Sequence, residues 1–75
     1  MTLGEKIRDL RENLNPVPTQ KEIATSLGMI QQKISRLERN EFEPSLQDII
    51  ALCLYYHVSA DYLLGLPRNL PYPKR

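Results

Sequence analysis

The chain has 75 residues, of which 41% are hydrophobic and 25% are charged, and its formal net charge at pH 7 is +1. This length allows one small domain, and the composition is that of a folded globular protein rather than a disordered one. No apolar run approaches the roughly 20 residues that a membrane span needs, and the N-terminus lacks a signal peptide's apolar stretch. We therefore expect a cytoplasmic protein with no membrane partner.

Cysteine and histidine are scarce, which limits the chemistry open to the chain. There is one of each, Cys53 and His57. One cysteine cannot form an internal disulfide, and with a single histidine it cannot build a metal site. Cys53 is expected to be an inert small hydrophobe, and His57 a residue that ends a helix in the left-handed conformation. We expect no metal, no cofactor, no small-molecule ligand and no enzymatic activity.

The charges are distributed unevenly along the chain. Residues 20–39 carry a net charge of +2, whereas residues 41–61 carry four acids and no base. Further positive charges, at Arg68, Lys74 and Arg75, lie at the C-terminal end. Positive charge concentrated on one element favours a polyanionic partner, although many nucleic-acid binders are far more basic.

The first predicted helix begins after Thr2. Thr2 and Glu5 have the spacing of a capping box, in which each side chain bonds the other residue's backbone amide. The apolar residues at helical spacing are Leu3, Ile7, Leu10 and Leu14. We therefore expect a helix to about Leu14, which Pro16 and Pro18 prevent from continuing.

Residues 20–39 predict two short helices joined by a tight turn. The first covers residues 20–27 and starts at a second capping box, formed by Thr19 and Glu22. The second covers residues 31–39. Gly28 lies between them, where a sharp bend with positive φ costs least. This is a helix-turn-helix pattern, and its second helix would enter the major groove of DNA.

The second of these helices starts without a capping side chain. Met29 and Ile30 occupy the capping position, and neither can accept an amide hydrogen bond. One interpretation is that Ile30 packs as a hydrophobic staple and that water satisfies the free amides. The other is that the amides face a phosphate, or that Ile30 contacts a thymine methyl group.

A third capping box, Ser45 with Asp48, predicts a fourth helix over about residues 45–56. Its expected buried residues are Leu46, Ile49, Ile50, Leu52 and Cys53. Before it, Asn40 is a suitable left-handed residue for the end of the preceding helix.

Ser59 is expected to cap a fifth helix over residues 60–64, which Gly65 ends. The last ten residues contain three prolines and predict an extended tail. We therefore expect an all-α chain, a compact five-helix bundle, with one domain over residues 1–66 and a Pro-rich tail over residues 67–75.

Residues 2–65 resemble the Cro and phage-repressor type of helix-turn-helix domain, the XRE family. The matching segments are LRE at 10–12, TQKEIA at 19–24, LG at 27–28, ISRLE at 34–38, EPSL at 43–46 and VSADYLLG at 58–65. The resemblance implies a lambda-repressor-like domain that binds a pseudo-palindromic operator in double-stranded DNA as a homodimer and regulates transcription.

The resemblance also implies roles for individual residues. Those implied to contact bases are Gln31, Gln32, Lys33 and Arg36. Those implied to contact phosphates are Thr19, Gln20, Arg39 and Asn40, and Gln20 is also implied to brace the reading helix. A glutamine amide can bond adenine N6 and N7 together, and a basic side chain can reach a guanine edge. The alternative is a solvated helix face with no ligand.

Two other segments bear on the resemblance. Arg11 and Glu38 match a pair that joins the first helix to the third through a buried salt bridge, which is a structural role. The acidic segment Glu41–Glu43 departs from the family's pattern, which often has glycine and basic residues near the phosphates. Because DNA repels carboxylates, either backbone amides of residues 40–42 make that contact or the affinity is modest.

A two-fold operator requires two reading helices about 34 Å apart, and hence a dimer. The expected interface residues are Tyr55, Tyr56, Tyr62 and Leu66. Tyrosines suit an interface, although Tyr56 and Tyr62 could instead complete a small core.

Three classes of function follow. The first is a sequence-specific transcriptional regulator, of the phage-repressor, restriction-controller or antitoxin type. The second is a protein-interaction module that uses the same fold with weak or no DNA binding. The third is an enzyme, which the sequence does not favour because it contains no Gly-rich phosphate loop and no paired catalytic carboxylates.

Overall fold

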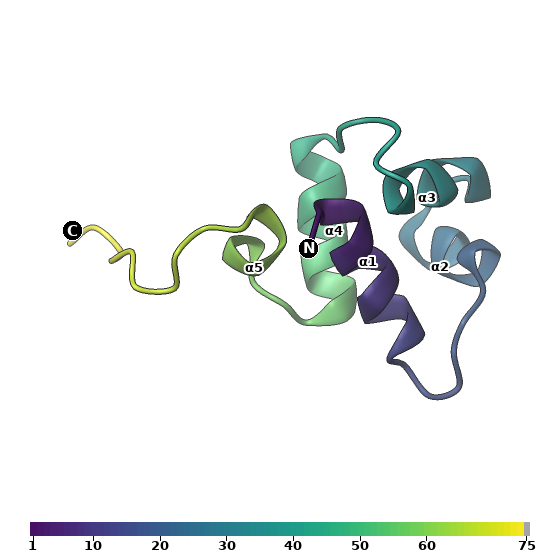
Figure 1. Ribbon diagram of the computed structural model, residues 1–75, viewed down its shortest axis with the longest axis horizontal. Helices are drawn as coiled ribbons and strands as arrows, with labels where there is room; N and C mark the ends of the chain where they lie inside the picture. The colour runs from purple at the N-terminus through teal and green to yellow at the C-terminus, as the bar shows by residue number, and fades with distance from the viewer. Residues whose placement is uncertain (75) are drawn as a thin grey trace.

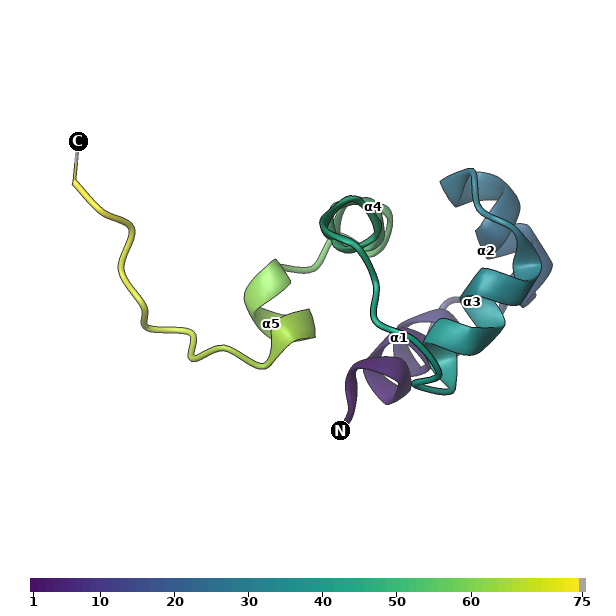
Figure 2. The ribbon, with the colours of Figure 1, turned by 90° about the horizontal axis from the view of Figure 1, so that it is seen from above.

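The computed structural model describes residues 1–74, which form five helices and no strand. The helices are α1 (Leu3–Glu12), α2 (Gln20–Leu27), α3 (Gln31–Glu38), α4 (Leu46–Tyr56) and α5 (Ala60–Leu64). α2 packs closely against α3, α1 packs against α3 and α5, and α4 packs against α5 and α2 (Figure 1). Seen from above, α1 lies between α3 and α5 (Figure 2). The expected all-α five-helix bundle is confirmed.

The three capping boxes form as expected from the sequence. In each, the hydroxyl of the capping residue accepts a hydrogen bond from a backbone N–H three residues later, and the carboxylate there accepts one in return. The pairs are Thr2 with Glu5, Thr19 with Glu22, and Ser45 with Asp48, at distances of 2.8 to 3.1 Å. The backbone amide of the capping threonine is the main reason why the pKa of each glutamate is lowered. Local sequence therefore determines where α1, α2 and α4 begin.

The expected left-handed residues also end their helices. Gly28 has φ of 69° after α2, and Gly65 has φ of 74° after α5. Asn40 and His57 adopt the same region, with φ of 59° and 56°. At His57 the backbone closes α4 with a bond from the Val58 N–H to the Cys53 carbonyl oxygen, 3.1 Å long.

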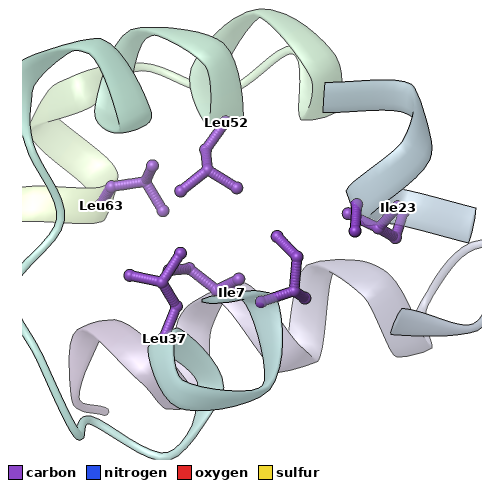
Figure 3. Close-up of a cluster of buried hydrophobic side chains, with 7 residues drawn as sticks. Ile7, Ile23, Leu37, Leu52 and Leu63 are labelled. Atoms are coloured by element: carbon purple, nitrogen blue, oxygen red, sulfur yellow. The ribbon is translucent and has the colours of Figure 1, made fainter. Parts of the chain in front are cut away.

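Each helix contributes to one hydrophobic core. Figure 3 shows the side chains of Ile7, Ile23, Leu37, Leu52 and Leu63, one from each helix, converging on a common centre. All five are buried, as are Ala24 and Ile34. Burial of one such leucine or isoleucine stabilises the fold by about 1.5–3 kcal/mol. The core therefore holds all five helices in one unit.

The prediction that α1 reaches about Leu14 is wrong. The helix ends at Glu12, and Asn13 closes it: its side-chain amide donates to the Asp9 carbonyl oxygen at 2.8 Å. Leu14 is exposed. The physical reason is that asparagine side chains compete with the helix by bonding nearby backbone groups, so the chain leaves the helix at Asn13, before the limit that Pro16 sets. Similarly, α3 ends at Glu38 and Arg39 is its C-cap, one residue earlier than expected.

The predicted buried face of α4 is also partly wrong. Ile49 and Leu52 are buried and Cys53 is partly buried, but Leu46 is 81% exposed and Ile50 is 51% exposed. With Leu54 they form an exposed apolar row at a spacing of four residues. Since α4 carries apolar residues around most of its circumference, periodicity could not identify the side that the other helices cover.

Gly4 allows a close contact between α1 and α3 that was not expected from the sequence. A Cβ atom at Gly4 would lie 2.6 Å from the carbonyl oxygens of both Leu37 and Glu38. The Gly4 N–H donates to Asn40 Oδ1 at 2.9 Å, and Asn40 Nδ2 donates to Thr2 Oγ1 at 2.9 Å. The end of α3 is therefore attached directly to the start of α1.

After Gly65, residues 66–74 contain no helix or strand and extend away from the bundle (Figure 1). Leu70 and Tyr72 are exposed there. The division into a domain over residues 1–66 and a tail over residues 67–75 remains a prediction, and Arg75 lies outside the described residues. Within residues 1–74, none of the helices has the length and apolar character needed to cross a membrane.

Candidate nucleic-acid interface

The relative position of α2 and α3 is set by the turn and by buried side chains on both helices. Gly28 lets the backbone reverse, and the following Met29 N–H bonds the Ala24 carbonyl oxygen at 2.8 Å. Ile23 and Ala24 of α2 and Ile34 of α3 are buried. The small side chain of Ala24 lets the two helices approach closely. The structure therefore forms the expected helix-turn-helix, with α3 held firmly along its inner side.

The outer side of α3 carries the polar residues expected to contact bases. Gln31, Gln32 and Arg36 are all exposed. Gln32 and Arg36 are four residues apart and thus lie on the same side of the helix, one turn apart. Arg36 takes part in none of the ion pairs found among residues 1–74. These three side chains are free to contact a ligand.

Lys33, the fourth residue expected to contact a base, is placed differently. Its Nζ lies 2.7 Å from Oδ1 of Asp48 at the start of α4. The side chain of Asp48 is 7% exposed and that of Lys33 is 32% exposed. Burial raises the pKa of Asp48, but hydrogen bonds from Lys33 and from Ser45 outweigh it, and that pKa is lowered overall. Lys33 therefore joins α3 to α4.

The uncapped start of α3 is exposed to solvent. Ile30 occupies the capping position with φ of −84° and ψ of 151°, and its side chain makes no capping hydrogen bond to the first amides of α3. Its side chain is 68% exposed, so it does not pack as a hydrophobic staple would. It borders a shallow pocket of about 250 Å³. The pocket is lined by Ile30, Gln32, Lys33, Arg36 and Phe42. An apolar group could enter beside the polar side chains of α3.

Glu38, at the end of α3, accepts hydrogen bonds from two other helices. Arg11 of α1 donates through Nε to Oε2 at 2.8 Å and through Nη2 to Oε1 at 3.0 Å. Gln20 of α2 donates through Nε2 to Oε1 at 3.0 Å. The hydrogen bond to Glu38 is the main reason why the pKa of Arg11 is raised. This arrangement satisfies a buried carboxylate and fixes α3 against both neighbours.

The residues expected to contact phosphates lie at the start of α2 and at the end of α3, which the bond from Gln20 to Glu38 holds close together. Thr19 is exposed and Gln20 half-buried at the start of α2, where the Gln20 amide group bonds Glu38. Arg39 is exposed at the end of α3 and pairs with Glu41, with 2.9 Å between Nε and Oε2. Asn40 uses its side chain in the bonds to α1. A phosphate contact at Arg39 would therefore compete with a neighbouring carboxylate.

The residues expected at a dimer interface do not form one exposed surface. Tyr55 and Tyr56 are partly buried against the core, with their rings edge to face and 5.0 Å between centroids. Burial raises the pKa of Tyr56 to about 12. Tyr62 and Leu66 are exposed and border an open cavity of about 560 Å³. Lys6 also lines it and donates from Nζ to the Tyr62 carbonyl oxygen at 2.8 Å.

Sequence reasoning missed two structural residues of this region. Asp48 was recognised as a helix cap, but its bond to Lys33 joins residues 15 positions apart and no local pattern signals it. Phe42 was seen only as part of an acidic loop, yet it lines the pocket on α3. Among residues 1–74, no group of three or more His, Cys, Asp or Glu could hold a metal ion.

The fold and this geometry define the class of protein: an all-α, repressor-like domain built around a helix-turn-helix. The sequence model that describes the helix-turn-helix family matches residues 19–63 of the chain. The chain therefore belongs to this family.

Two known proteins are similar to the chain. The first is the HTH-type transcriptional regulator ImmR of Bacillus subtilis (strain 168), 35% identical over 65 residues. That match covers 87% of this chain and 50% of ImmR, so the chain spans about half the length of that relative. The second is the P22 c2 repressor protein, solved in complex with synthetic operator 9T in the presence of Tl⁺. It is 33% identical with a TM-score of 0.77, and the match covers 84% of this chain and 92% of that one.

Proposed function

We propose that the protein is a sequence-specific DNA-binding transcriptional regulator that places α3 in the major groove of its operator. The observation that carries this proposal is the exposed row of Gln31, Gln32 and Arg36 on a helix held rigidly by its other side. Support comes from the two relatives, of which one is named a transcriptional regulator and the other was solved with an operator. A cytoplasmic location goes with this function.

The residues divide by the chemistry that each can offer to DNA. The amides of Gln31 and Gln32 suit adenine, and the guanidinium of Arg36 suits guanine or a flanking phosphate. Thr19, Arg39 and the free amides at the start of α3 suit phosphate oxygens. Specificity in this scheme depends mainly on neutral amide groups, while the net charge contributes little.

We also propose that the active species is a homodimer. A two-fold operator presents two half-sites about one helical turn apart, which one copy of this domain cannot span. Tyr62 and Leu66, exposed at the end of the bundle, are the members of the expected interface best placed to meet a second copy. Tyr55 and Tyr56 would support that surface from within.

Selection of binding sites from random double-stranded DNA tests the function directly. The chain should enrich a pseudo-palindromic motif. Replacing Gln31 and Gln32 together with alanine should remove the preference and reduce affinity for the motif by roughly 30- to 20,000-fold, because each of the two good bidentate contacts is worth about 1–3 kcal/mol.

Gln47→Ala is the matched control, because this exposed glutamine lies on α4. The replacement is outside the reading row, which consists of Gln31, Gln32 and Arg36. It should leave the motif and the affinity unchanged. Circular dichroism should show that every variant keeps its helices. A preference that survives the double replacement would show that the assignment of Gln31 and Gln32 is wrong.

A second candidate is a protein-interaction module. It is favoured by the exposed apolar row of Leu46, Ile50 and Leu54 on α4. Such a row is available for contact with an apolar surface on another protein. If the folded chain enriches no motif at either low or moderate salt, that result would favour the protein-interaction module over the regulator.

A further inference from the structure

We propose that Lys33 is a positioning residue, which holds α4 and the acidic loop against α3 and contacts no base. Base reading on α3 then falls to Gln31, Gln32 and Arg36. This inference rests on the proposed DNA-binding function and specifies how its reading surface is organised.

Both carboxylate oxygens of Asp48 accept a hydrogen bond in the folded protein. Oδ1 accepts from the Lys33 ammonium at 2.7 Å, and Oδ2 accepts from the Ser45 N–H at 3.0 Å. The Asp48 N–H in turn donates to the Ser45 hydroxyl at 3.1 Å. Its side chain is buried. The carboxylate thus ties the first turn of α4 to α3, and Lys33 is the one cation that it contacts among residues 1–74.

The position of Lys33 around α3 agrees with this role. Residues four apart lie on the same side of a helix. Lys33 is therefore on the side of Leu37, which is buried against the rest of the bundle, whereas Gln32 is on the side of exposed Arg36. The stem of Lys33 runs along the flank of the helix toward α4. A major groove facing Gln32 and Arg36 would meet that flank only at its edge.

Asp48 and a guanine base would compete for the Lys33 ammonium, and this competition also favours a positioning role. If the ammonium left Asp48 for a guanine, it would exchange one charge-assisted bond for another of similar strength. The departure would also leave a buried carboxylate without its cation, beside the negatively charged DNA. The pair therefore persists in the complex and Lys33 adds no base preference.

The pair also affects the loop between the two helices. Residues 39–45 connect the end of α3 to the start of α4, and the loop is visible as the teal segment joining them (Figure 1). Phe42 of this loop and Lys33 line the same pocket. By anchoring the start of α4, Lys33 and Asp48 hold Phe42 beside the reading row and keep the two loop carboxylates in a defined place.

The test compares Lys33→Met with Lys33→Met/Asp48→Asn. Methionine keeps the stem but removes the ammonium, and asparagine can still accept the Ser45 amide bond. Affinity is measured for the selected operator and for each single base-pair variant of it. We expect Lys33→Met to lower affinity by the same factor, about 2- to 30-fold, for every sequence, because a residue that acts through packed neighbours changes binding by roughly 0.5–2 kcal/mol. The double variant should recover most of the loss and keep the wild-type order of base preferences.

Arg36→Ala is the comparator, because loss of a base contact should relax the preference at one position of the half-site. If both Lys33 variants lose discrimination at one position, Lys33 reads a base and the proposal is overturned. An unchanged affinity in folded Lys33→Met overturns it as well. A wild-type chain that selects no motif overturns the proposed function itself, which is a different result.

Discussion

At the scale of single residues, the cluster around Glu38 shows how one carboxylate can organise a small bundle. Arg11 binds it through two nitrogens and Gln20 binds one of its oxygens. Buried charges are tolerated when they are paired and hydrogen-bonded, and these contacts meet both conditions. The family resemblance implies that Gln20 both contacts a phosphate and braces the reading helix. Its bond to Glu38 fits the bracing role, because it positions α2 against the end of α3.

Gly4 is a second residue whose importance is visible only in three dimensions. Replacing a helical glycine with alanine ordinarily stabilises a helix by up to about 1 kcal/mol. At Gly4 the new Cβ would meet two backbone carbonyl oxygens at 2.6 Å, and backbone atoms cannot rotate away. We expect Gly4→Ala to reduce the free energy of unfolding by about 1–3 kcal/mol, measured by urea denaturation.

Asp9→Ala is a suitable control for that experiment, because Asp9 is an exposed position on the same helix. It should change the free energy of unfolding by less than about 0.5 kcal/mol. A stabilised Gly4→Ala protein would mean that α1 and α3 can separate at little cost.

At the scale of helices, the starts were predictable, whereas the ends of α1 and α3 and the buried face of α4 were not. Capping boxes and left-handed residues act within four positions of each other, so their signals survive in a single sequence. The buried side of α4 depends on which helices lie next to it. That information is absent from an almost uniformly apolar segment, and Leu46 and Ile50 were assigned to the wrong side.

The capping carboxylates also predict that the free energy of unfolding depends on pH. The pKa values of Glu5, Glu22 and Asp48 are lower in the folded chain than the ordinary values of 4.5 for Glu and 3.8 for Asp. As pH falls, the unfolded chain therefore binds these protons first. The stabilisation is complete above the ordinary pKa values and is lost as pH falls through the folded ones. Unfolding by urea at a series of pH values from 7 downward should show the loss beginning near pH 4.5.

Glu5→Gln provides the matched comparison for the acid experiment. Glutamine can still complete a capping box, but it cannot ionise. The variant should keep its helix content and show a smaller loss of stability on acidification than the unsubstituted chain. An identical pH dependence in both proteins would exclude Glu5 as a contributor.

At the scale of the whole molecule, ion pairs within the chain determine how much charge remains for DNA. Within residues 1–74, Lys33 and Arg39 are paired with carboxylates, whereas Arg36 is not. We expect about two to three phosphate contacts per protomer, and hence a slope of about −4 to −5 for log K against log salt in a dimer. Binding measured across a range of salt concentrations gives the slope, and sedimentation with operator DNA gives the stoichiometry.

A slope steeper than about −8 would show that many more phosphates are neutralised, and that the internal ion pairs open on binding. A single protomer on each selected site would contradict the homodimer. Measuring both quantities on one operator separates an error in the charge assignment from an error in the assembly.

The sequence alone determined the helix count, the places where most helices begin and end, and the helix-turn-helix with its exposed glutamines. These features depend on neighbouring residues, whose preferences are local. Only the tertiary structure decided that Lys33 bonds Asp48, that Gly4 lies against the end of α3, and which side of α4 is buried. Each of these joins residues far apart in the chain, so their contacts arise from how the helices pack together.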